Sequence, residues 1–267
     1  MSPNLLETEP APGVVRLALN RPELRNALDA ALIESLHGAV LRHGARAATR
    51  VLLIGAEGTA YCAGADLNAM QAFGRGQREA SVADAERLAS LLLAIRDCPK
   101  PSIAVVQGPA FGGGMGLAAA CDIAVGSTAA RFRLPEVQLG LVPAVISPYV
   151  LEAIGLRQAR RYFLSGEPID AERARELGLL HAVVPVAELE AEALRLAHEV
   201  AQGGPHALAE GKRLIADVAH RGPSAGLAGV TAEWLATLRE GREAQEGIGA
   251  VLERRPPAWR PGCSSAC

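Results

Sequence analysis

The chain has 267 residues, of which 49% are hydrophobic and 21% charged, so it is long and apolar enough for a sizeable core and is not a disordered protein. The formal net charge is −2, and basic residues are scattered among acidic ones, so no basic face for DNA or RNA is expected. No apolar run has the length of a membrane span, and residues 1–4 lack the pattern of a signal peptide. We therefore expect a cytoplasmic protein with neither a nucleic-acid nor a membrane partner.

Strand and helix patterns alternate over the first two-thirds of the sequence. Short apolar runs predict strands at 14–19, 51–54, 102–106 and 122–125. Apolar residues at helical spacing predict one helix after Asp29, its expected N-cap, and a second over about 82–95 that ends before Pro99. Because helices separate the strands, we expect an α/β fold with right-handed crossovers and a mostly parallel sheet.

Helical patterns dominate beyond Pro143. The run Gly203-Gly204-Pro205 predicts a hinge between the core and a C-terminal helical part, which either folds back or docks on a neighbouring copy. One short strand is expected at 181–184. The predicted helices are, approximately, 145–154, 158–164, 171–177, 187–202, 206–220 and, in pieces, 224–252.

The five cysteines form no Cys-x-x-Cys pair, and their odd number argues against a disulfide framework, so reduced thiols are expected. Cys62 and Cys121 fit small buried apolar positions. The six histidines include no close metal-ligand pair, and no metal site is predicted. The sequence contains no Gly-x-Ser-x-Gly elbow and no Gly-Lys-Ser or Gly-Lys-Thr, which disfavours a serine nucleophile and excludes a P-loop.

The segment 105–116 is the most informative part of the sequence. A strand pattern runs into Gly112-Gly113-Gly114 and then into an apolar, alanine-rich helix. The first amides of a helix have no partner inside it, and glycine allows a ligand to approach the main chain. The segment 60–67 likewise follows a strand and leads into a short helix. Two such amides converging on one oxygen would form an oxyanion hole, although glycine runs also occur in tight turns and close helix packing.

Eight motifs follow one another in a fixed order: NRPE at 20–23, NAL at 26–28, CAGADL at 62–67, the triple glycine, CD at 121–122, PE at 135–136, LGLVP at 139–143 and ERR at 253–255. Together they resemble the crotonase superfamily, the enoyl-CoA hydratases and isomerases, over nearly the whole chain. The resemblance implies repeated ββα units that form a spiral of two stacked sheets. It implies a spiral α/β core with the active site over 1–203, a C-terminal helical trimerisation region over 204–267, and a homo-oligomer that is a trimer or a dimer of trimers.

By the same resemblance, the amides of Ala63 and Gly113 hold the thioester oxygen of an acyl-CoA substrate. Arg254 matches a basic position that reaches a phosphate of coenzyme A across a subunit boundary, although it also fits a solvated helix end. Coenzyme A is then part of the substrate, and no separate cofactor is implied. The remaining residues of the coenzyme A pocket are Arg25, Ala27, Gly64, Ala65, Asp66 and Leu67, of which Asp66 also fits a helix cap.

One departure from the family pattern concerns the catalytic carboxylates. Enoyl-CoA hydratases use two glutamates, and the first would fall at Gly116, whereas the second is matched by Glu136. Adding water to a conjugated double bond needs a group that deprotonates water and a proton source for the α-carbon, so Glu136 serves both roles or another group helps it. Without the resemblance, Glu136 after Pro135 would be a solvated carboxylate at a helix start.

A finer resemblance concerns 140–150, Arg161-Tyr162 and 254–259. These segments are similar to those of bacterial 3-methylglutaconyl-CoA hydratases of leucine breakdown, which are in turn similar to isohexenylglutaconyl-CoA hydratases of terpene breakdown. Such substrates carry a carboxylate on the acyl chain, which needs a donor or cation in the pocket. The candidate donors are Arg133, Ser147 and Tyr149.

The leading hypothesis is an enoyl-CoA hydratase that acts on 3-methylglutaconyl-CoA or on a longer 3-substituted glutaconyl-CoA. One alternative is a Δ3,Δ2-enoyl-CoA isomerase in which Glu136 alone moves the proton. The other is a non-catalytic homologue that binds coenzyme A or associates with RNA and that lost turnover when a glutamate became Gly116, since fold alone does not establish function.

Overall fold

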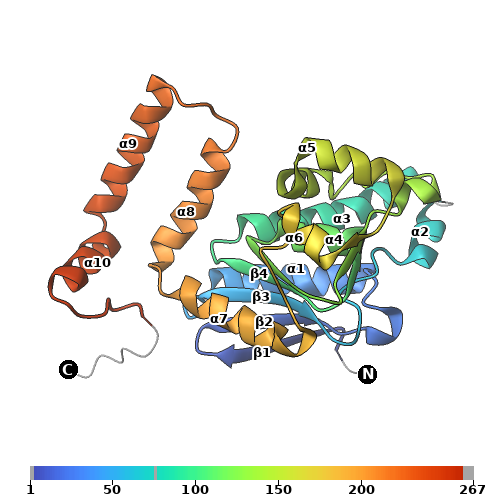
Figure 1. The fold of residues 1–267 in the computed structure, drawn as a ribbon, viewed down its shortest axis with the longest axis horizontal. Helices are drawn as coiled ribbons and strands as arrows, with labels where there is room; N and C mark the ends of the chain where they lie inside the picture. The colour runs from blue at the N-terminus through green and yellow to red at the C-terminus, as the bar shows by residue number, and fades with distance from the viewer. Residues whose placement is uncertain (1–2, 75–76, 261–267) are drawn as a thin grey trace.

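The computed structural model describes residues 3–74 and 77–260 (Figure 1). A large sheet forms one layer, with the strand order β1-β2-β3-β4-β6-β9. The β1–β2 pair is antiparallel, and each of the following pairs is parallel, as the alternation of strands and helices predicted. The strands are β1 (Leu5–Ala11), β2 (Val14–Leu19), β3 (Val51–Ala56), β4 (Ser102–Val106), β6 (Ile123–Ser127) and β9 (Ala182–Val184).

A smaller sheet contains β5 (Pro109–Phe111), β7 (Arg131–Arg133) and β8 (Ile169–Asp170). An isolated bridge between Cys62 and Ala110 extends this layer toward the preceding segment of the chain. From β4 to β7 the strands alternate between the sheets, since β4 and β6 lie in the large sheet and β5 and β7 in the small one. This alternation agrees with the two-sheet arrangement that the resemblance implied.

The helices cover the two faces of the large sheet (Figure 1). Asp29 caps α1 as predicted, because its carboxylate accepts a hydrogen bond from the Leu32 N–H at 2.8 Å. The two helices predicted at 145–154 and 158–164 are found as the two halves of α5, which Gly155 separates with a non-helical φ of +73°. The helices of the core are α1 (Ala30–Ala45), α2 (Leu67–Gly74), α3 (Arg78–Asp97), α4 (Gly113–Ala120), α5 (Ser147–Ser165), α6 (Ala171–Glu176) and α7 (Leu189–Ala201).

The continuous apolar runs of the central strands are explained by burial on both faces. In β3, Leu52 and Ile54 join the core cluster that contains residues of α1, α3, α4 and α5. Val51 and Leu53 point to the opposite face and pack in a second cluster with residues of α7. Because successive side chains of a strand alternate between faces, a strand covered on both sides reads as uniformly apolar.

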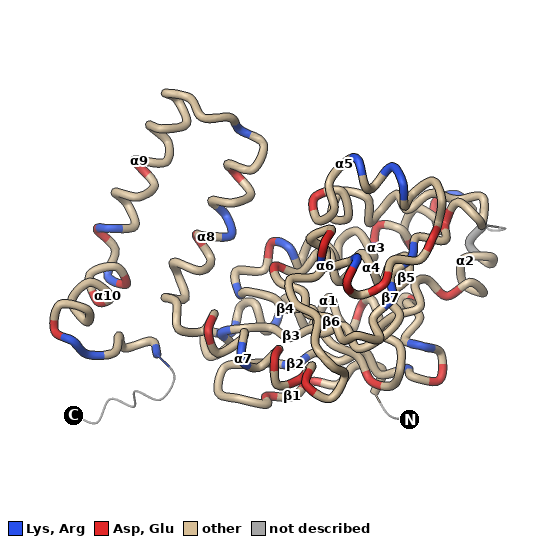
Figure 2. The backbone as a smooth tube through the Cα atoms, viewed as in Figure 1, with Lys and Arg blue, Asp and Glu red and all other residues tan. Residues whose placement is uncertain are grey.

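Three helices form an arm that stands away from the core (Figure 1). They are α8 (Pro205–Val218), α9 (Ala225–Glu240) and α10 (Arg242–Leu252), and α8 begins at the Pro205 of the predicted hinge. No residue of α8 or α9 is buried, although every residue of both helices is described. Basic and acidic residues are interspersed along the arm and the core (Figure 2). Among the described residues, no helix has both the length and the apolar character needed to cross a membrane.

Arg50, just before β3, fastens the base of the arm to the core. Its guanidinium donates hydrogen bonds to the carbonyl oxygens of Ala201 at 3.1 Å, Gly203 at 2.7 Å and Trp259 at 2.7 Å. These carbonyls belong to the end of α7, the hinge and the C-terminal segment. One side chain therefore holds together three segments that are distant in the sequence.

The variant Arg50→Met keeps much of the aliphatic stem but removes all of these donors. We expect its free energy of unfolding, measured by urea denaturation, to fall by about 2–4 kcal/mol, because charged hydrogen bonds to carbonyls are lost. The control Arg46→Met removes an exposed guanidinium and should change stability by less than about 0.5 kcal/mol. Equal losses in the two variants would show that the Arg50 contacts do not stabilise the fold.

Candidate active site

The triple glycine lies between β5 and α4, where two backbone segments pack in direct contact. A Cβ atom added to Gly114 would lie 2.5 Å from the Cys62 carbonyl oxygen, so this position needs glycine for close approach. The Gly112 N–H donates to the Arg133 carbonyl oxygen at 2.9 Å, and the Gly116 N–H donates to that of Gly112 at 3.1 Å. Within the described residues, the Gly113 N–H has no backbone or side-chain acceptor. It remains available at the start of α4, as the sequence predicted.

The segment 63–66 runs beside these glycines. Gly64 has a φ of +93°, a conformation that side-chain-bearing residues rarely adopt. A Cβ atom added there would lie 3.0 Å from the Phe111 carbonyl oxygen and 3.8 Å from the Gly113 nitrogen. The amides that follow Gly64 are therefore close to the start of α4.

The prediction that the Ala63 amide is an oxyanion donor is wrong for this structure. Its N–H already donates to the Arg25 carbonyl oxygen at 2.9 Å. Leu28 pairs with this segment through its main chain. Its N–H donates to the Gly64 carbonyl oxygen at 2.8 Å, and its carbonyl oxygen accepts from the Asp66 N–H at 3.1 Å, so Ala65 lies between the two bonds. Among the described residues, no acceptor binds the Ala65 N–H. Ala65, which is exposed, therefore presents the unpaired amide that Ala63 does not.

Glu136 brings a carboxyl group to the same place. It opens the short helix η2 (Glu136–Leu139) after Pro135, and its Oε1 lies 2.8 Å from where a Cβ atom on Gly112 would be. Its Oε2 is buried and has no hydrogen-bond partner among the described residues. Burial raises the pKa of this carboxyl, and the residue's own N–H offsets part of that rise. Glu136 is therefore not a solvated helix-start carboxylate, because its acid group faces the glycines of α4.

Gly116 lies one helical turn beyond Gly112, and its surroundings leave no space for a carboxylate. A Cβ atom added there would lie 2.3 Å from the Cγ2 and 2.8 Å from the Cβ of Ile146. Ile146 is 3% exposed and immediately precedes α5. The position of the missing glutamate is thus filled by an isoleucine that the sequence did not indicate.

The other residues expected in the coenzyme A pocket have different places. Asp66 caps α2, since its Oδ1 accepts from the N–H groups of Asn68 at 2.9 Å and Ala69 at 3.2 Å. Leu67 starts that helix and is 61% exposed, so its side chain is open to a ligand. Arg254 follows α10, which lies in the arm, away from α4 and at the opposite end of the molecule from α2 (Figure 1). Arg254 therefore does not reach the glycines of its own chain.

Arg25 and Ala27 lie in the loop that carries the partner of Ala63. Arg25 is exposed and adopts a φ of +50°, and the Ala27 N–H donates to the Leu24 carbonyl oxygen at 3.0 Å. Both residues are on the loop that contacts the segment 63–66, which agrees with a place at the edge of the site. Their predicted contacts with coenzyme A stay a prediction.

Asn26 has a structural role that the sequence reasoning missed. It is fully buried, and its Nδ2 donates to the carbonyl oxygens of Glu57 and Ala60, both at 2.9 Å, while its Oδ1 accepts from the Arg21 N–H at 2.8 Å. Asn26 thus holds the loop that carries the Arg25 carbonyl. Its position in the Asn-Ala-Leu motif was the available signal, because asparagine tolerates the positive φ of +56° found here.

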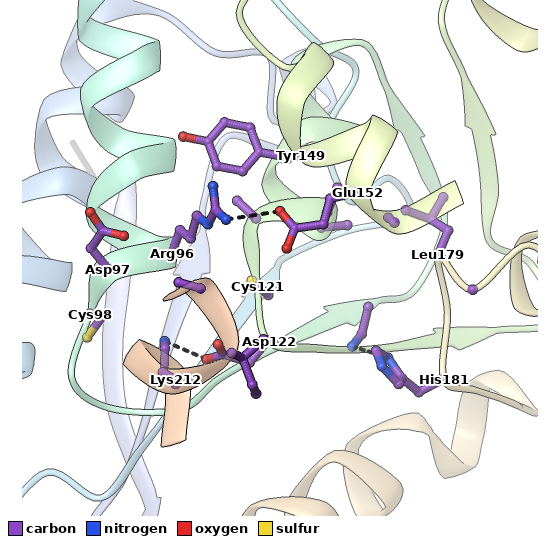
Figure 3. Close-up of a pocket in the computed structure, with 18 of the residues that line it drawn as sticks. Arg96, Asp97, Cys98, Cys121, Asp122, Tyr149, Glu152, Leu179, His181 and Lys212 are labelled. Atoms are coloured by element: carbon purple, nitrogen blue, oxygen red, sulfur yellow. Dashed lines mark hydrogen bonds and ion pairs between the residues drawn. The ribbon is translucent and has the colours of Figure 1, made fainter. Parts of the chain in front are cut away.

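The candidate donors for a substrate carboxylate are occupied elsewhere. Arg133 donates from Nε to the Gly166 carbonyl oxygen and from Nη2 to Gln138, both at 2.7 Å. The Ser147 hydroxyl donates to the Ala144 carbonyl oxygen at 2.7 Å. Tyr149 lines a separate cavity of about 500 Å³ at the far end of α4, together with Arg96, Cys121 and Lys212 (Figure 3). The structure does not bring these three side chains together beside Glu136.

The cysteines and histidines form neither a nucleophilic centre nor a metal centre in the described part of the chain. Cys62 is fully buried, and burial raises its pKa to about 12, which keeps the thiol protonated. Cys121 is half-buried, and burial also raises its pKa. No group of three or more His, Cys, Asp and Glu side chains in these residues could hold a metal ion. Cys263 and Cys267, also expected as reduced thiols, lie outside the described residues.

Comparisons with known proteins agree with this geometry. Residues 9–262 match the enoyl-CoA hydratase/isomerase family. A Thermus thermophilus relative named for enoyl-CoA hydratase is 35% identical over 243 residues, which cover 90% of this chain and 95% of the relative. A solved enoyl-CoA hydratase from Shewanella pealeana is 37% identical, with a TM-score of 0.92 and 96% of each chain covered. A crotonase-named structure from Legionella pneumophila is 40% identical, with a TM-score of 0.91 and coverage of 97% of this chain and 100% of that chain. The chain therefore belongs to the enoyl-CoA hydratase/isomerase family and has its crotonase fold.

Proposed function

We propose that the protein reversibly adds water to an α,β-unsaturated acyl-CoA, with Glu136 transferring the proton. One observation carries this proposal. The buried Oε2 of Glu136 has no hydrogen-bond partner in the described part of the chain, and its carboxyl lies against Gly112, next to amides of Gly113 and Ala65 that have no acceptor there either. An acid group and two main-chain donors are the parts needed to form and protonate an enolate.

In this reaction, the Glu136 carboxylate takes a proton from water as the water oxygen bonds to the β-carbon. The electron pair of the double bond moves onto the thioester oxygen, where the amides of Ala65 and Gly113 stabilise the negative charge. Glu136 then returns its proton to the α-carbon, and the carbonyl re-forms. Coenzyme A is part of the substrate in this proposal, and no separate cofactor takes part.

For the acyl group, we propose 3-methylglutaconyl-CoA or a longer 3-substituted glutaconyl-CoA. The resemblance of 140–150 and of the C-terminal motif supports this choice. Arg133 and Ser147 donate to other groups, and Tyr149 lines a separate cavity, so the substrate carboxylate needs another donor in the assembled protein. The cytoplasmic location expected from the sequence stays a prediction.

We also propose that the arm within 204–267 assembles this chain into a trimer or a dimer of trimers. The arm leaves large apolar side chains exposed, which supports burial against another copy. In such an assembly, Arg254 would contact a coenzyme A phosphate bound to a neighbouring subunit, since it is far from the glycines of its own chain. The exposed apolar residues are Ile215, Val230, Leu235, Ile248, Val251 and Leu252.

A second candidate function is a Δ3,Δ2-enoyl-CoA isomerase. It is favoured by the packing at Gly116, because Ile146 fills the place of a second carboxylate and leaves Glu136 as the acid beside α4. An isomerase needs one group that moves a proton between two carbons, whereas a hydratase must also activate water.

The variant Glu136→Gln tests the assignment of the proton-transferring group. On a panel of short, branched and carboxylated enoyl-CoAs, we expect it to lower kcat by about 10²–10⁴-fold, because the amide cannot accept the proton. The control Glu167→Gln, at a half-buried residue that pairs with Arg161, should keep wild-type turnover. Full turnover in Glu136→Gln would remove Glu136 from the mechanism.

Turnover in water labelled with ¹⁸O separates the two reactions, because hydration alone brings solvent oxygen into the carbon skeleton. Product without the label would overturn the hydratase in favour of the isomerase. If coenzyme A binds while every thioester of the panel stays inert, the protein is a non-catalytic homologue.

The variant Ala65→Pro tests the revised oxyanion donor, because proline has no N–H. We expect kcat to fall by about 10²–10³-fold. Ala65→Gly retains the amide and should keep kcat within about tenfold of the wild type. Circular dichroism and acyl-CoA binding check that the proline variant stays folded. Equal kcat values in a folded Ala65→Pro and in Ala65→Gly would show that this amide does not stabilise the enolate.

The raised pKa of Glu136 predicts how stability depends on pH. A carboxyl whose folded-state pKa is raised binds its proton more tightly in the folded state, so its favourable contribution is present below the unfolded pKa of about 4.3 and is lost as pH rises through the folded pKa. We expect Glu136→Gln to be more stable than the wild type at neutral pH. Its advantage should shrink on acidification.

The control Glu167→Gln should behave with the opposite sign. The hydrogen bond from Arg161 lowers the pKa of Glu167, so its ionised form favours the folded state above the unfolded pKa. Urea denaturation at several pH values measures both variants. A Glu136→Gln variant that is less stable than the wild type at neutral pH would contradict the predicted burial cost.

A further inference from the structure

Glu136 and Ile146 pack against two glycines at the start of α4. Gly112 is the N-cap of this helix, and a Cβ atom added there would meet the Glu136 carboxyl, whereas one added to Gly116 would meet Ile146. The Gly116 N–H donates to the Gly112 carbonyl oxygen at 3.1 Å, so the first turn of α4 separates the two glycines. Glu136 and Ile146 therefore contact positions that are one turn apart at the start of α4.

The surroundings of the unpaired Gly113 amide are apolar. A Cβ atom added to Gly113 would lie 2.9 Å from the Cδ1 of Leu28 and 3.7 Å from the Cδ2 of Leu88. Ile146 continues this apolar lining at Gly116. Its branched side chain has few rotamers available, so its Cγ2 methyl has little freedom to move off Gly116.

The main chain around Ile146 is also fixed. Its carbonyl oxygen accepts from the Val150 N–H at 3.1 Å in the first turn of α5. Just before it, the Ala144 carbonyl oxygen accepts both from the Ser147 N–H at 3.2 Å and from the Ser147 hydroxyl at 2.7 Å. At the other end of the loop, the Leu141 N–H donates to the Glu136 carbonyl oxygen at 2.9 Å. The loop between η2 and α5, held by these hydrogen bonds, therefore positions both Glu136 and Ile146.

We propose that Ile146 is a specificity-determining residue for the acyl group. Its side chain occupies the space beside Gly116 and so limits the bulk that an acyl substituent can have on this side of the reacting carbons. This inference rests on the proposed function, because it assigns the acyl group to the end of α4 that lies beside Glu136. The ligand is an acyl-CoA whose acyl chain would contact the apolar side chains of Leu28, Leu88 and Ile146.

The first experiment measures substrate selection in Ile146→Ala. The ratio of kcat/KM for a longer or 3-branched enoyl-CoA to that for crotonyl-CoA should rise by at least about tenfold, chiefly through a lower KM for the larger substrate, because a cavity opens beside Gly116. Ile146→Val should give a smaller rise. The matched control is Ile154→Ala, a buried position of α5 that is 5% exposed and does not contact Gly116 in this way.

Ile154→Ala should lower stability and leave that ratio unchanged. If Ile146→Ala changes both substrates equally, or if Ile154→Ala shifts the ratio as much, Ile146 is a packing residue and the proposal fails. A change confined to kcat for both substrates would also overturn it, because a size filter acts on the binding of the larger acyl group.

The second experiment tests the contact between Gly116 and Ile146 through stability, and it needs no activity assay. Gly116→Ala should lower the melting temperature in the wild-type background, since its new methyl meets Ile146. In the Ile146→Ala background, the same change should cost less, because the obstructing side chain is gone. Additive effects of the two substitutions would show that the residues do not compete for one space, and the proposal would fall.

A failure of the proposed function can be distinguished from a failure of the proposal for Ile146. If the wild type turns over no enoyl-CoA, the proposed function fails, and the size filter is then measured as binding of butyryl-CoA and of a longer saturated acyl-CoA by calorimetry. A gain in affinity for the longer ligand alone in Ile146→Ala would support the filter. Unchanged relative affinities would overturn it.

Discussion

The site depends on a close contact between two stretches of main chain. Gly114 packs against the Cys62 carbonyl oxygen at a distance that no side chain could share, and Gly64 takes a positive φ beside Phe111. This contact brings the start of α4 and the segment after Gly64 together. Within the described residues, the Gly113 amide has no acceptor because it begins α4, and the Ala65 amide has none because it lies between the two hydrogen bonds of the Leu28 bridge. Because Gly112 also lacks a side chain, the Glu136 carboxyl can pack against it. The absence of side chains at these glycines therefore allows the acid and the two amides to lie close together.

The electrostatic character of the site follows from its apolar surroundings. Leu28 and Leu88 lie around Gly113, Ile146 covers Gly116, and the Oε2 of Glu136 has no partner among the described residues. Burial of this kind strengthens the attraction between an amide dipole and a developing oxyanion. It also makes an ionised Glu136 unfavourable for folding. Catalytic use and folding stability therefore oppose each other at this residue, as is common in active sites.

The sequence predicted the features that depend on long patterns. The strand at 51–54 was found because both faces of β3 are buried, and the α1 cap was found because Asp29 precedes a helical repeat. Strands β5, β7 and β8 have only two or three residues, too few to show an alternation. Edge strand β1 is exposed at four of its seven positions and contains Pro10. Ala63 was preferred to Ala65 because the direction of an N–H depends on the distant Arg25 carbonyl, which sequence spacing does not reveal.

The contacts of Arg50 have a consequence for how the arm can change during evolution. All three of its acceptors are main-chain carbonyl oxygens, in Ala201, Gly203 and Trp259. A guanidinium that binds carbonyls does not distinguish the side chains that the neighbouring residues carry. The helices beyond the hinge can therefore diverge in sequence while the hydrogen bonds from Arg50 to the main chain at their base are retained. Such tolerance suits chimaeras in which the arm of one relative is grafted onto the spiral core of another.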